Sequence, residues 1–474
     1  MDFFDIFDIL SEEYIVKNEL AVIEAFAGYG SQLQSLNYIR EFFGIDKVKY
    51  KHHKICEWAM NSIIAYADLH RNDLPFYNTD FSKPLTKNEI AEYLFKKGVS
   101  IDYSKPATLD QLKRVKEDKL RLCYNAIQWS NNLVDVARVK GSDLEIDNSK
   151  RDYLFTFSFP CQNLSLAGKM ANLKKKEEIN EENLYDIENR SNMLWQVVRI
   201  IRECYNLGYE HMPTIMLLEN VPMLHSKDNM DCFKEMINIF EKLGYSVWWD
   251  DLTATDFGIP QTRNRTFVIF ILNGKNGETY KYNFPKPVPL TLRLKDLLES
   301  NVDEKYYLSE KTDQIDFIGN YSKSNFNQTS IVGKNGIAPT VTENHGQVTA
   351  ITENVKPKVI GGIGEMKSNG GTQYYQQDRI YDENCAISVT TSFNPNYQVG
   401  LRIRKLTPRE CFRLMGLKNK SIDLLMEHQN NSSSYRLAGD SIVCYGVLTS
   451  IFCQLFGLDY KKMLEDKEWW KNGN

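Results

Sequence analysis

The sequence lacks the features that mark membrane, secreted and zinc-binding proteins. No run of about 18 apolar residues occurs, so we expect no membrane-spanning helix. The opening residues, MDFFDIFDILSEEY, are acidic and have no basic start of the kind found in signal peptides. The nine cysteines form no CxxC pair, which favours free thiols in a reducing cytoplasm over disulfides or structural zinc. We therefore expect a cytoplasmic protein without a metal site.

An excess of positive charge is also lacking. The formal net charge is −4, so the whole chain gives no indication of a nucleic-acid partner. This balance does not exclude one, because a basic cleft can lie on an acidic body. Hydrophobic residues make up 42% and charged residues 25%, which is ordinary for a globular protein, and 474 residues suffice for two or three domains.

Apolar and amphipathic segments alternate in the first 275 residues. Residues 20–39 predict a buried strand, a Gly-rich turn and a helix, and residues 51–70 repeat this pattern with a strand that ends near Glu57. Further strands are expected within 152–160, 213–221 and 266–272, with an amphipathic helix over 193–208. Strands that alternate with helices imply a parallel sheet covered by helices on both faces.

The amino-acid composition changes after about residue 275. Residues 300–400 are rich in Gly, Asn, Thr, Tyr and Ser, which predicts a smaller, irregular, β-leaning domain. Helix signals return at 406–417, and an amphipathic helix is expected toward the end of the chain. Residues 71–130 lie between the second and third strands and are expected to be largely helical, with no obvious chemistry.

Two positions at strand ends indicate a bound cofactor. The turn FAGYG (26–30) follows the first strand, and small residues there let a backbone approach a ligand. Glu57 ends the second strand, where this class of fold binds a ribose hydroxyl, and Trp58 offers a face for adenine. A tight turn for FAGYG and a core position for Trp58 are the alternatives. Together the residues favour an adenosine-containing cofactor, although the full GxGxxG fingerprint is missing.

Cys161 lies in FSFPCQNLSLAG (157–168), where Pro160 breaks the strand and presents the thiol on a turn. A structural free cysteine is the alternative for an isolated thiol. Glu219 ends another strand of the same sheet, and a carboxyl near a thiolate suits covalent catalysis. Arg263 and Arg265 just precede a further strand, where they can supply donors to a substrate carbonyl.

With these residues the sequence resembles the DNA cytosine-C5 methyltransferases. The matching blocks appear in the family's usual order from about residue 20 to 455, and they are EAFAGYGS, CEWA, FSFPCQNLSLAG, NRSNMLW, LLENVPML, FGIPQTRNR, RKLTPRECFRLMGL and YRLAGDSIV. The resemblance implies an α/β fold, a Rossmann-like S-adenosylmethionine-dependent methyltransferase sheet with a smaller irregular β-rich target-recognition domain. It also implies methyl transfer from S-adenosylmethionine to C5 of a flipped-out cytosine in double-stranded DNA.

The resemblance assigns a role to each matching position. Cys161 is the nucleophile, Glu219 binds and protonates the ring at N3, and Arg265 with Arg263 faces the flipped base and supports Glu219. The segment 162–190 is the loop that closes over DNA. The cofactor contacts implied are Phe26, Ala27, Gly28, Gly30, Glu57, Trp58, Asp135, Val136, Pro160, Leu194 and Ser441.

The same resemblance divides the chain. It implies an N-terminal extension (1–19), a catalytic domain (20–290) with the insertion at 71–130, a target-recognition domain (291–425) and a C-terminal helix returning to the catalytic domain (426–474). A monomer of a bacterial or phage restriction-modification system is expected, with a cognate restriction endonuclease as a possible partner. A tRNA cytosine-C5 methyltransferase and a catalytically silent DNA-binding relative are the alternatives.

Three positions depart from the family pattern. Glu24 stands where Asp is usual, Ser31 where Gly is frequent, and Asp440 where Asn is usual before Ser441. None of these changes removes a catalytic group. Because Gly-Asp-Ser precedes an apolar segment, we expect Asp440 to cap a helix that begins near Ile442.

Overall fold

A six-stranded sheet, with strand order β3-β2-β4-β5-β7-β6, forms the centre of the structure, which is a computed structural model. The structure describes residues 12–159, 193–307 and 404–471, and only the backbone of 401–403 and of five short strands between 331 and 397. The strands of the central sheet are β2 (Leu20–Ala25), β3 (Tyr50–Cys56), β4 (Asp152–Phe157), β5 (Ile215–Asn220), β6 (Tyr245–Thr253) and β7 (Asn264–Leu272).

The sheet is mixed, which corrects the expectation of a wholly parallel sheet. Strands β3, β2, β4 and β5 pair in parallel, whereas β7 runs antiparallel to both β5 and β6. The reason is the short connection from β6 to β7, because a chain that turns back at once can pair only antiparallel. Sequence analysis missed β6 altogether, since YSVWWDDLT carries two aspartates in its second half.

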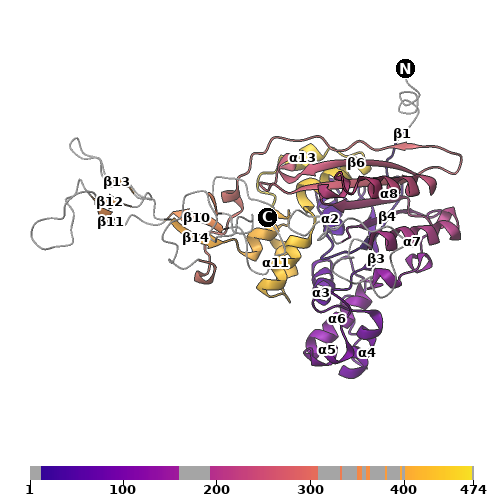
Figure 1. The fold of residues 1–474 in the computed structure, drawn as a ribbon, viewed down its shortest axis with the longest axis horizontal. Helices are drawn as coiled ribbons and strands as arrows, with labels where there is room; N and C mark the ends of the chain where they lie inside the picture. The colour runs from indigo at the N-terminus through magenta and orange to yellow at the C-terminus, as the bar shows by residue number, and fades with distance from the viewer. Residues whose placement is uncertain are drawn as a thin grey trace, which may run out of the picture.

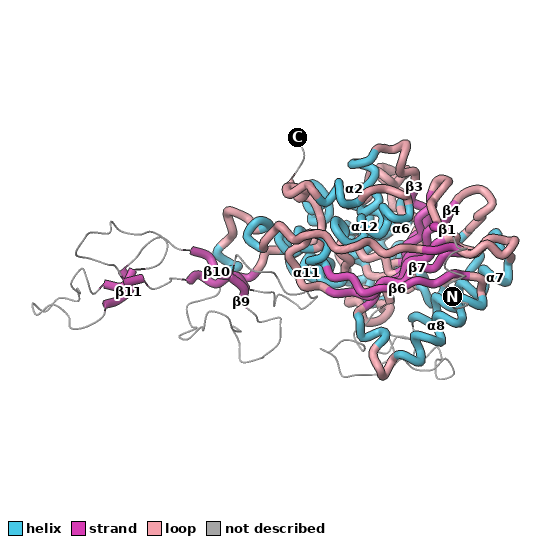
Figure 2. Tube along the Cα trace, turned by 90° about the horizontal axis from the view of Figure 1, so that it is seen from above, coloured by secondary structure: helices cyan, strands magenta, loops and turns pink. Residues whose placement is uncertain are grey.

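Helices cover both faces of the sheet, as the alternation of segments predicts. Figure 2 shows α2 (Ser31–Phe43) and α12 (Thr449–Leu455) on one side and α7 (Met193–Leu207) and α8 (Met230–Lys242) on the other. Along β5, Ile215 and Leu217 belong to the first core and Met216 and Leu218 to the second. This alternation with a period of two is what a strand buried on both faces requires.

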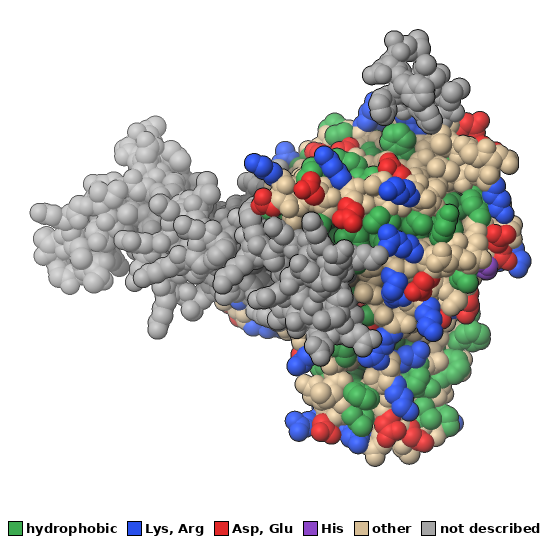
Figure 3. All heavy atoms as spheres, turned by 45° about the vertical axis from the view of Figure 1, so that its right-hand side comes forward, with side chains coloured by type: hydrophobic (Ala, Val, Ile, Leu, Met, Phe, Trp, Pro, Cys, Tyr) green, Lys and Arg blue, Asp and Glu red, His purple; other side chains and the backbone are tan. Residues whose placement is uncertain are grey.

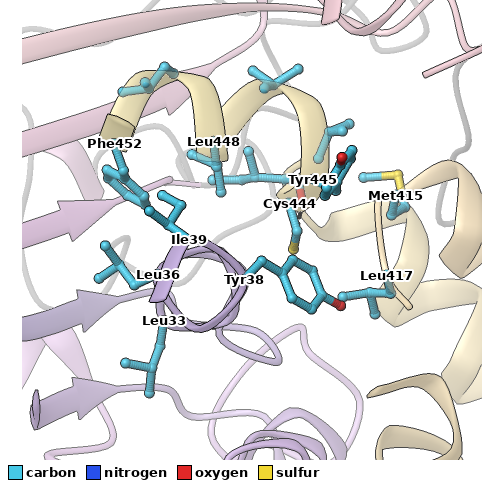
Figure 4. Packing of buried hydrophobic residues seen from close by; sticks show 14 of the residues in the cluster. Leu33, Leu36, Tyr38, Ile39, Met415, Leu417, Cys444, Tyr445, Leu448 and Phe452 are labelled. Atoms are coloured by element: carbon cyan, nitrogen blue, oxygen red, sulfur yellow. Dashed lines mark hydrogen bonds between the residues drawn. The ribbon is translucent and has the colours of Figure 1, made fainter. Parts of the chain in front are cut away.

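The end of the chain packs on α2, near its beginning. The returning segment consists of α11 (Asn431–Asp440), the π-helical turn η12 (Cys444–Leu448) and α12, and Figure 4 shows Cys444, Leu448 and Phe452 facing Leu36, Tyr38 and Ile39 of α2. Among the described residues one helical stretch, Asn431–Leu455, is long and apolar enough to cross a membrane, but 83% of its most apolar window is buried inside the protein. It is part of the core.

The insertion is helical, as expected. It contains α4 (Lys87–Lys97), α5 (Leu109–Arg114) and α6 (Glu117–Trp129), which pack with α3 (Met60–Leu69) around a core of their own. Figure 1 shows α4, α5 and α6 grouped at one end of the molecule, beyond α3. Both α4 and α5 begin with a Thr capping box, at Thr86 and Thr108, which satisfies free N–H groups of their first turns.

Short strands occupy the region with the loop-like composition. Two three-stranded sheets have the orders β14-β10-β9 and β11-β12-β13, and they lie to one side of the central sheet in Figure 1. The bounds of these strands are β9 (Ile331–Gly333), β10 (Ala350–Asn354), β11 (Val359–Gly362), β12 (Arg379–Tyr381), β13 (Asn396–Tyr397) and β14 (Leu401–Lys405). The remaining strands and α-helices are β1 (Glu12–Glu13), β8 (Tyr280–Lys281), α9 (Pro408–Leu414), α10 (Asn419–Met426) and α13 (Tyr460–Leu464).

One buried ion pair joins the two points where the chain leaves and re-enters the main body. Glu410 at the start of α9 binds the Arg404 guanidinium through two contacts of 2.8 Å, and both side chains are fully buried. The Glu410 carboxylate also accepts from the backbone N–H of Thr407 and of Glu299, each at 2.8 Å. Glu410 therefore fixes residue 299 and residues 404–407 to a single point.

We expect Glu410→Ala to lower the free energy of unfolding by about 3–5 kcal/mol, because it leaves the Arg404 charge buried without a partner. The combined variant Arg404→Met/Glu410→Leu should regain most of that loss, since it buries no charge. Urea denaturation measures both. Glu468→Ala, which breaks an exposed pair with Lys471, is the control and should leave the midpoint nearly unchanged. Equal midpoints for Glu410→Ala and the wild type would contradict this account.

Candidate functional site

The predicted site residues gather at one edge of the sheet. Because β2, β3, β4 and β5 are parallel, their carboxyl ends meet at this edge, where α/β proteins bind ligands. The turn 26–30 follows β2, Glu57 follows β3, Ser158 follows β4, and Glu219 lies near the end of β5. Two groups of side chains form there, one around Glu57 and one around Glu219.

The turn after β2 has the backbone shape of a ligand-binding loop. Phe26, Gly28 and Gly30 all have positive φ, of 56°, 57° and 82°. A Cβ on Gly30 would lie 2.4 Å from His70 Nε2, so only glycine fits there, whereas a Cβ on Gly28 would meet no atom within 4 Å. Open space next to Gly28 leaves room for a ligand against the backbone. His70 holds the turn, since Nε2 lies 3.0 Å from the carbonyl oxygen of Tyr29.

Glu57 connects this turn to the end of β3. Its carboxylate accepts from the backbone N–H of Gly28 and of Ala59, each at 2.8 Å. Burial raises the pKa of Glu57 to about 7, while the backbone N–H groups around it lower it. Asn132 fixes the backbone, because its side chain accepts from Glu57 N (3.0 Å) and donates to Glu57 O (2.9 Å). Sequence analysis did not single out Asn132.

Trp58 and Asp135 lie beside Glu57, and both side chains have more contacts within the protein than we expected. Trp58 is partly buried and packs against the core of the insertion. The Asp135 carboxylate accepts from Ala137 N at 3.1 Å and pairs with Arg138 Nε at 3.1 Å. Val136 follows Asp135 and belongs to the apolar core between the sheet and α7. Asp135 is therefore already held by two partners within the protein.

Apolar residues and Ser441 complete this group. Leu194, at the start of α7, is fully buried in the same core as Val136, Ala25 and Phe157, with Phe26 packed against it. Ser441 Oγ donates to Ala438 O at 2.9 Å, and the next residue, Ile442, donates its N–H to Ser31 Oγ at 3.4 Å. The contact with Ser31 places Ser441 at the start of α2. Pro160, also predicted here, lies outside the described residues.

Unusual backbone conformations cluster around the same place. The described part of the chain contains five non-glycine residues with positive φ, and four of them lie at or beside this group of residues: Phe26, Tyr103, Asn131 and Val134. A β-branched residue such as Val134 is an outlier in this region of φ/ψ space. Backbone strain of this kind concentrates where proteins bind ligands.

The second group is centred on Glu219. Arg265 Nε on β7 lies 3.1 Å from Glu219 Oε1, and Ser158 Oγ donates to Glu219 Oε2 at 2.6 Å. Glu219 is 5% exposed, so its carboxyl is held in a fixed orientation at a buried position. The next residue, Asn220, donates from Nδ2 to Phe159 O at 3.1 Å. Arg265, which the sequence analysis expects to support Glu219, is in contact with it, whereas the sequence analysis did not single out Ser158.

The predicted nucleophile, Cys161, comes shortly after Ser158 in the sequence. Cys161 and the loop 162–190 lie outside the described residues. Ser158 and Phe159, the last two described residues before them, are both bound to the end of β5. These two hydrogen bonds anchor the segment from which Cys161 emerges.

Arg263 is placed differently from the prediction. Its Nη2 donates to the carbonyl oxygens of Gly439 (3.1 Å) and Ser441 (2.7 Å) at the end of α11, and the side chain is 5% exposed. A cation at a helix C-terminus binds carbonyl groups that have no partner within the helix. The sequence analysis expects Arg263 to support Glu219 together with Arg265, but among the described residues its guanidinium donates to the segment that carries Ser441.

The predicted helix cap at Asp440 is wrong. Asp440 is the last residue of α11, and its carboxylate lies 3.5 Å from Arg436 Nε in the same helix. No helix begins at Ile442, because the next helical turn starts at Cys444. The sequence argument failed because YRLAGD continues a helix through Gly439.

Comparison with known proteins identifies the class. The model of the C-5 cytosine-specific DNA methylase family matches residues 113–456. The chain belongs to this family. It is also 30% identical over 442 residues to the type II methyltransferase M2.ScrFI of Lactococcus lactis subsp. cremoris, an alignment that spans 92% of this chain and 99% of that protein. It is 30% identical over 321 residues to the orphan methyltransferase M.SssI of Spiroplasma monobiae, with 66% and 74% covered.

Membership establishes the activity and the cofactor. The protein is a DNA (cytosine-5-)-methyltransferase, and its methyl donor is S-adenosylmethionine. The first group of residues suits this cofactor, because open space beside Gly28 adjoins a buried carboxyl and an apolar floor. A solved methyltransferase of Entamoeba histolytica, EhMeth, has the same fold, with a TM-score of 0.51 and 16% identity over 93% of this chain and 99% of that one.

The two arginines should give different defects. Arg265→Ala removes the partner of Glu219 and should lower kcat by about 100-fold, with little change in S-adenosylmethionine affinity. Arg263→Ala leaves the carbonyls of Gly439 and Ser441 without their donor, so it should weaken cofactor binding and lower the melting temperature. Calorimetry and single-turnover kinetics on both variants separate these effects. A cofactor affinity that falls only in Arg265→Ala would contradict the placement.

Proposed function

We propose that methyl transfer proceeds through a covalent bond between Cys161 and C6 of a cytosine flipped out of duplex DNA. The observation that carries the proposal is the Arg265–Glu219–Ser158 arrangement, which fixes a buried carboxyl at the point where the Cys161 turn begins. Cys161 follows Phe159 by two residues in the sequence, and two residues of chain span at most about 7 Å. A stacked base cannot enter such a site, so the target base must leave the helix.

The chemistry requires these residue types. Cytosine C5 is a poor nucleophile until a thiolate adds at C6, which makes C5 enamine-like. Glu219 donates a proton or a hydrogen bond to N3 and so stabilises the negative charge of the adduct. Arg265 keeps the Glu219 carboxyl in the orientation that reaches N3. C5 would then take the methyl group, with the donor leaving as its thioether; loss of the C5 proton to a base afterwards breaks the C6–S bond, expels the Cys161 thiolate and restores the aromatic ring.

The first group of residues holds the methyl donor. Bound S-adenosylmethionine supplies an electrophilic methyl group for C5. Glu57 accepts hydrogen bonds from the ribose, and Trp58 and Phe26 flank the adenine. Val136, Leu194 and Pro160 form the apolar wall, and Asp135 contacts the adenine amine. The remaining backbone contacts come from Ala27, Gly28, Gly30 and Ser441.

The region between residues 300 and 400 selects the DNA sequence. The attachment at Glu410 supports this assignment, because it fixes both ends of the region to the catalytic body. Figure 3 shows Lys and Arg side chains interspersed with acidic ones on the described face. We therefore expect DNA phosphates to contact individual basic side chains at separate places on this face. We assign 20–290 to the catalytic domain, 291–425 to target recognition and 426–474 to the returning C-terminal segment.

The relatives support a biological setting for this activity. M2.ScrFI is a type II methyltransferase, and M.SssI is an orphan methyltransferase. We assign this protein to a bacterial or phage restriction-modification system, acting as a monomer on cytoplasmic DNA, with a cognate endonuclease as its partner in that system. Methylation that protects host DNA from such an endonuclease is the role that fits this assignment.

The covalent step is tested by trapping. Random-sequence duplexes that carry 5-fluorocytosine should form a denaturation-resistant complex in the presence of S-adenosylmethionine, because fluorine at C5 cannot leave as a proton. Cys161→Ser should abolish the complex. Cys232→Ser, at a described cysteine that is only partly buried, is the matched control and should retain it. A complex that persists in Cys161→Ser would place the nucleophile elsewhere.

Cofactor affinity should depend on pH through Glu57. Burial raises the pKa of Glu57 to about 7 in the free protein, and hydrogen bonds from ribose hydroxyls favour the ionised form. Binding therefore releases a proton below pH 7, so S-adenosylhomocysteine affinity should fall as the pH drops from 7 to 5 and level off above 7. Calorimetry measures this as a decrease approaching tenfold per pH unit. The variant Glu57→Gln should bind weakly with a flat profile, and an unchanged slope in Glu57→Gln would contradict the assignment.

A further inference from the structure

The side chain of Asn132 takes the place of a strand partner at the end of β3. β3 is an edge strand of the central sheet, and the chain after α6 pairs with its outer side at Ile55, whose carbonyl oxygen accepts from Leu133 N at 2.8 Å. Two residues further on, Glu57 N donates to Asn132 Oδ1 at 3.0 Å, and Asn132 Nδ2 donates to Glu57 O at 2.9 Å. The amide therefore pairs with both backbone groups of Glu57, as a neighbouring strand would.

The last helix of the insertion holds Asn132 in place. α6 ends in a Schellman motif, in which Asn131 N donates to Gln128 O at 3.3 Å and Asn132 N donates to Ile127 O at 3.0 Å. Asn131 has a positive φ of 48°, as this motif requires of the residue after the helix. Asn132 is 4% exposed. The insertion thus ends by placing one buried amide against the end of β3.

The same amide shapes the segment that carries Asp135. Asn132 Oδ1 accepts a second hydrogen bond, from Val134 N at 2.8 Å, which closes a tight turn of the Asx type. Val134 has a φ of 71°, which a β-branched residue rarely adopts, so its surroundings must impose this conformation. Asp135 follows at once, and its N–H donates to Leu133 O at 3.1 Å. One side chain thus connects the residue proposed to bind the ribose with the segment proposed to contact the adenine amine.

The Glu57 backbone decides where the Glu57 carboxylate lies. That carboxylate accepts from Gly28 N and Ala59 N, each at 2.8 Å, so it joins the turn after β2 to the residue before α3. Without the Asn132 amide, the N–H and C=O of Glu57 would lose their partners at a buried position, which is costly. The end of β3 would then move to satisfy these groups and would carry the carboxylate with it.

We propose that Asn132 is a positioning residue for cofactor recognition, which holds Glu57 in the orientation that accepts hydrogen bonds from the ribose hydroxyls of S-adenosylmethionine. The inference rests on the proposed binding of the ribose by Glu57. It gives the insertion a role, because α6 supplies the motif that fixes Asn132. The effect of Asn132 reaches the ligand through Glu57 rather than through a contact of its own.

The test measures recognition of the ribose hydroxyls by calorimetry on the full chain without DNA. The ligands are S-adenosylhomocysteine and its 2′,3′-dideoxy analogue, which lacks both hydroxyls. The wild type should bind the analogue about tenfold more weakly, because the carboxylate then loses its ligand donors. Asn132→Ala should bind S-adenosylhomocysteine about tenfold more weakly than the wild type does, and should bind the two ligands with nearly equal Kd.

A second variant, Asn132→Ser, separates positioning from folding. A serine hydroxyl can accept from Val134 N in the same local turn, but it is too short to keep both bonds to the Glu57 backbone. Asn132→Ser should therefore fold and should still lose the preference for S-adenosylhomocysteine over the analogue. A loss of stability alone would lower the melting temperature and leave this preference unchanged.

The matched control is Asn125→Ser in the same helix. The buried Asn125 amide accepts from Ser82 N at 2.9 Å and donates to Asp80 Oδ1 at 3.0 Å, within the insertion. This variant should lower the melting temperature but keep the wild-type preference between the two ligands. Loss of the preference in Asn125→Ser as well would overturn the specific role of Asn132.

The outcomes distinguish the inference from the assignment on which it rests. A folded Asn132→Ser that keeps the wild-type preference would overturn the role of Asn132 and leave the ribose site intact, provided that Glu57→Gln loses the preference. A wild-type protein that binds both ligands equally, or a Glu57→Gln variant that keeps the full preference, would overturn the binding of the ribose by Glu57, and the inference with it.

Discussion

Parallel pairing of β3, β2, β4 and β5 is the constraint on which the functional arrangement depends. β2, β4 and β5 are buried along their whole length, and all four strands end at the same edge of the sheet. Residues far apart in sequence therefore meet there. Ser158 and Glu219 are 61 residues apart and share a hydrogen bond because Phe157 and Leu218 are partners in the sheet.

Three buried glutamates hold parts of the protein together, two of them at this sheet edge, and each does so in a different way. Glu57 is held by backbone N–H groups, which leaves its pKa raised to about 7 by burial. Glu219 has a cation and a hydroxyl as partners, which fixes its orientation for a substrate. Glu410 has a bidentate arginine and two backbone donors, which suits a purely structural junction. Surroundings rather than residue type thus distinguish the binding role proposed for Glu57 and the catalytic role proposed for Glu219 from the structural role of Glu410.

Local patterns predicted most of the fold and part of the site. The turn 26–30 and Glu57 are readable because a strand, small residues and an acidic strand end follow one another in a short segment. Ser158 and Asn132 were missed, since their partners lie 61 and 75 residues away and nothing in the neighbouring sequence marks them. The direction of β7 and the separate placement of Arg263 depend on how β6 turns back, which periodicity alone does not specify.

The central claim is that this chain methylates C5 of cytosine in DNA, and the most direct measurement is bisulfite sequencing of DNA from a host that lacks cytosine methylation. The account predicts that expression of the wild-type chain protects cytosines at one recurring sequence, and that Cys161→Ser protects none. Absence of protected cytosines with wild-type protein that is folded and binds S-adenosylhomocysteine would contradict it. Equal protection by the Cys161→Ser variant would contradict the covalent mechanism.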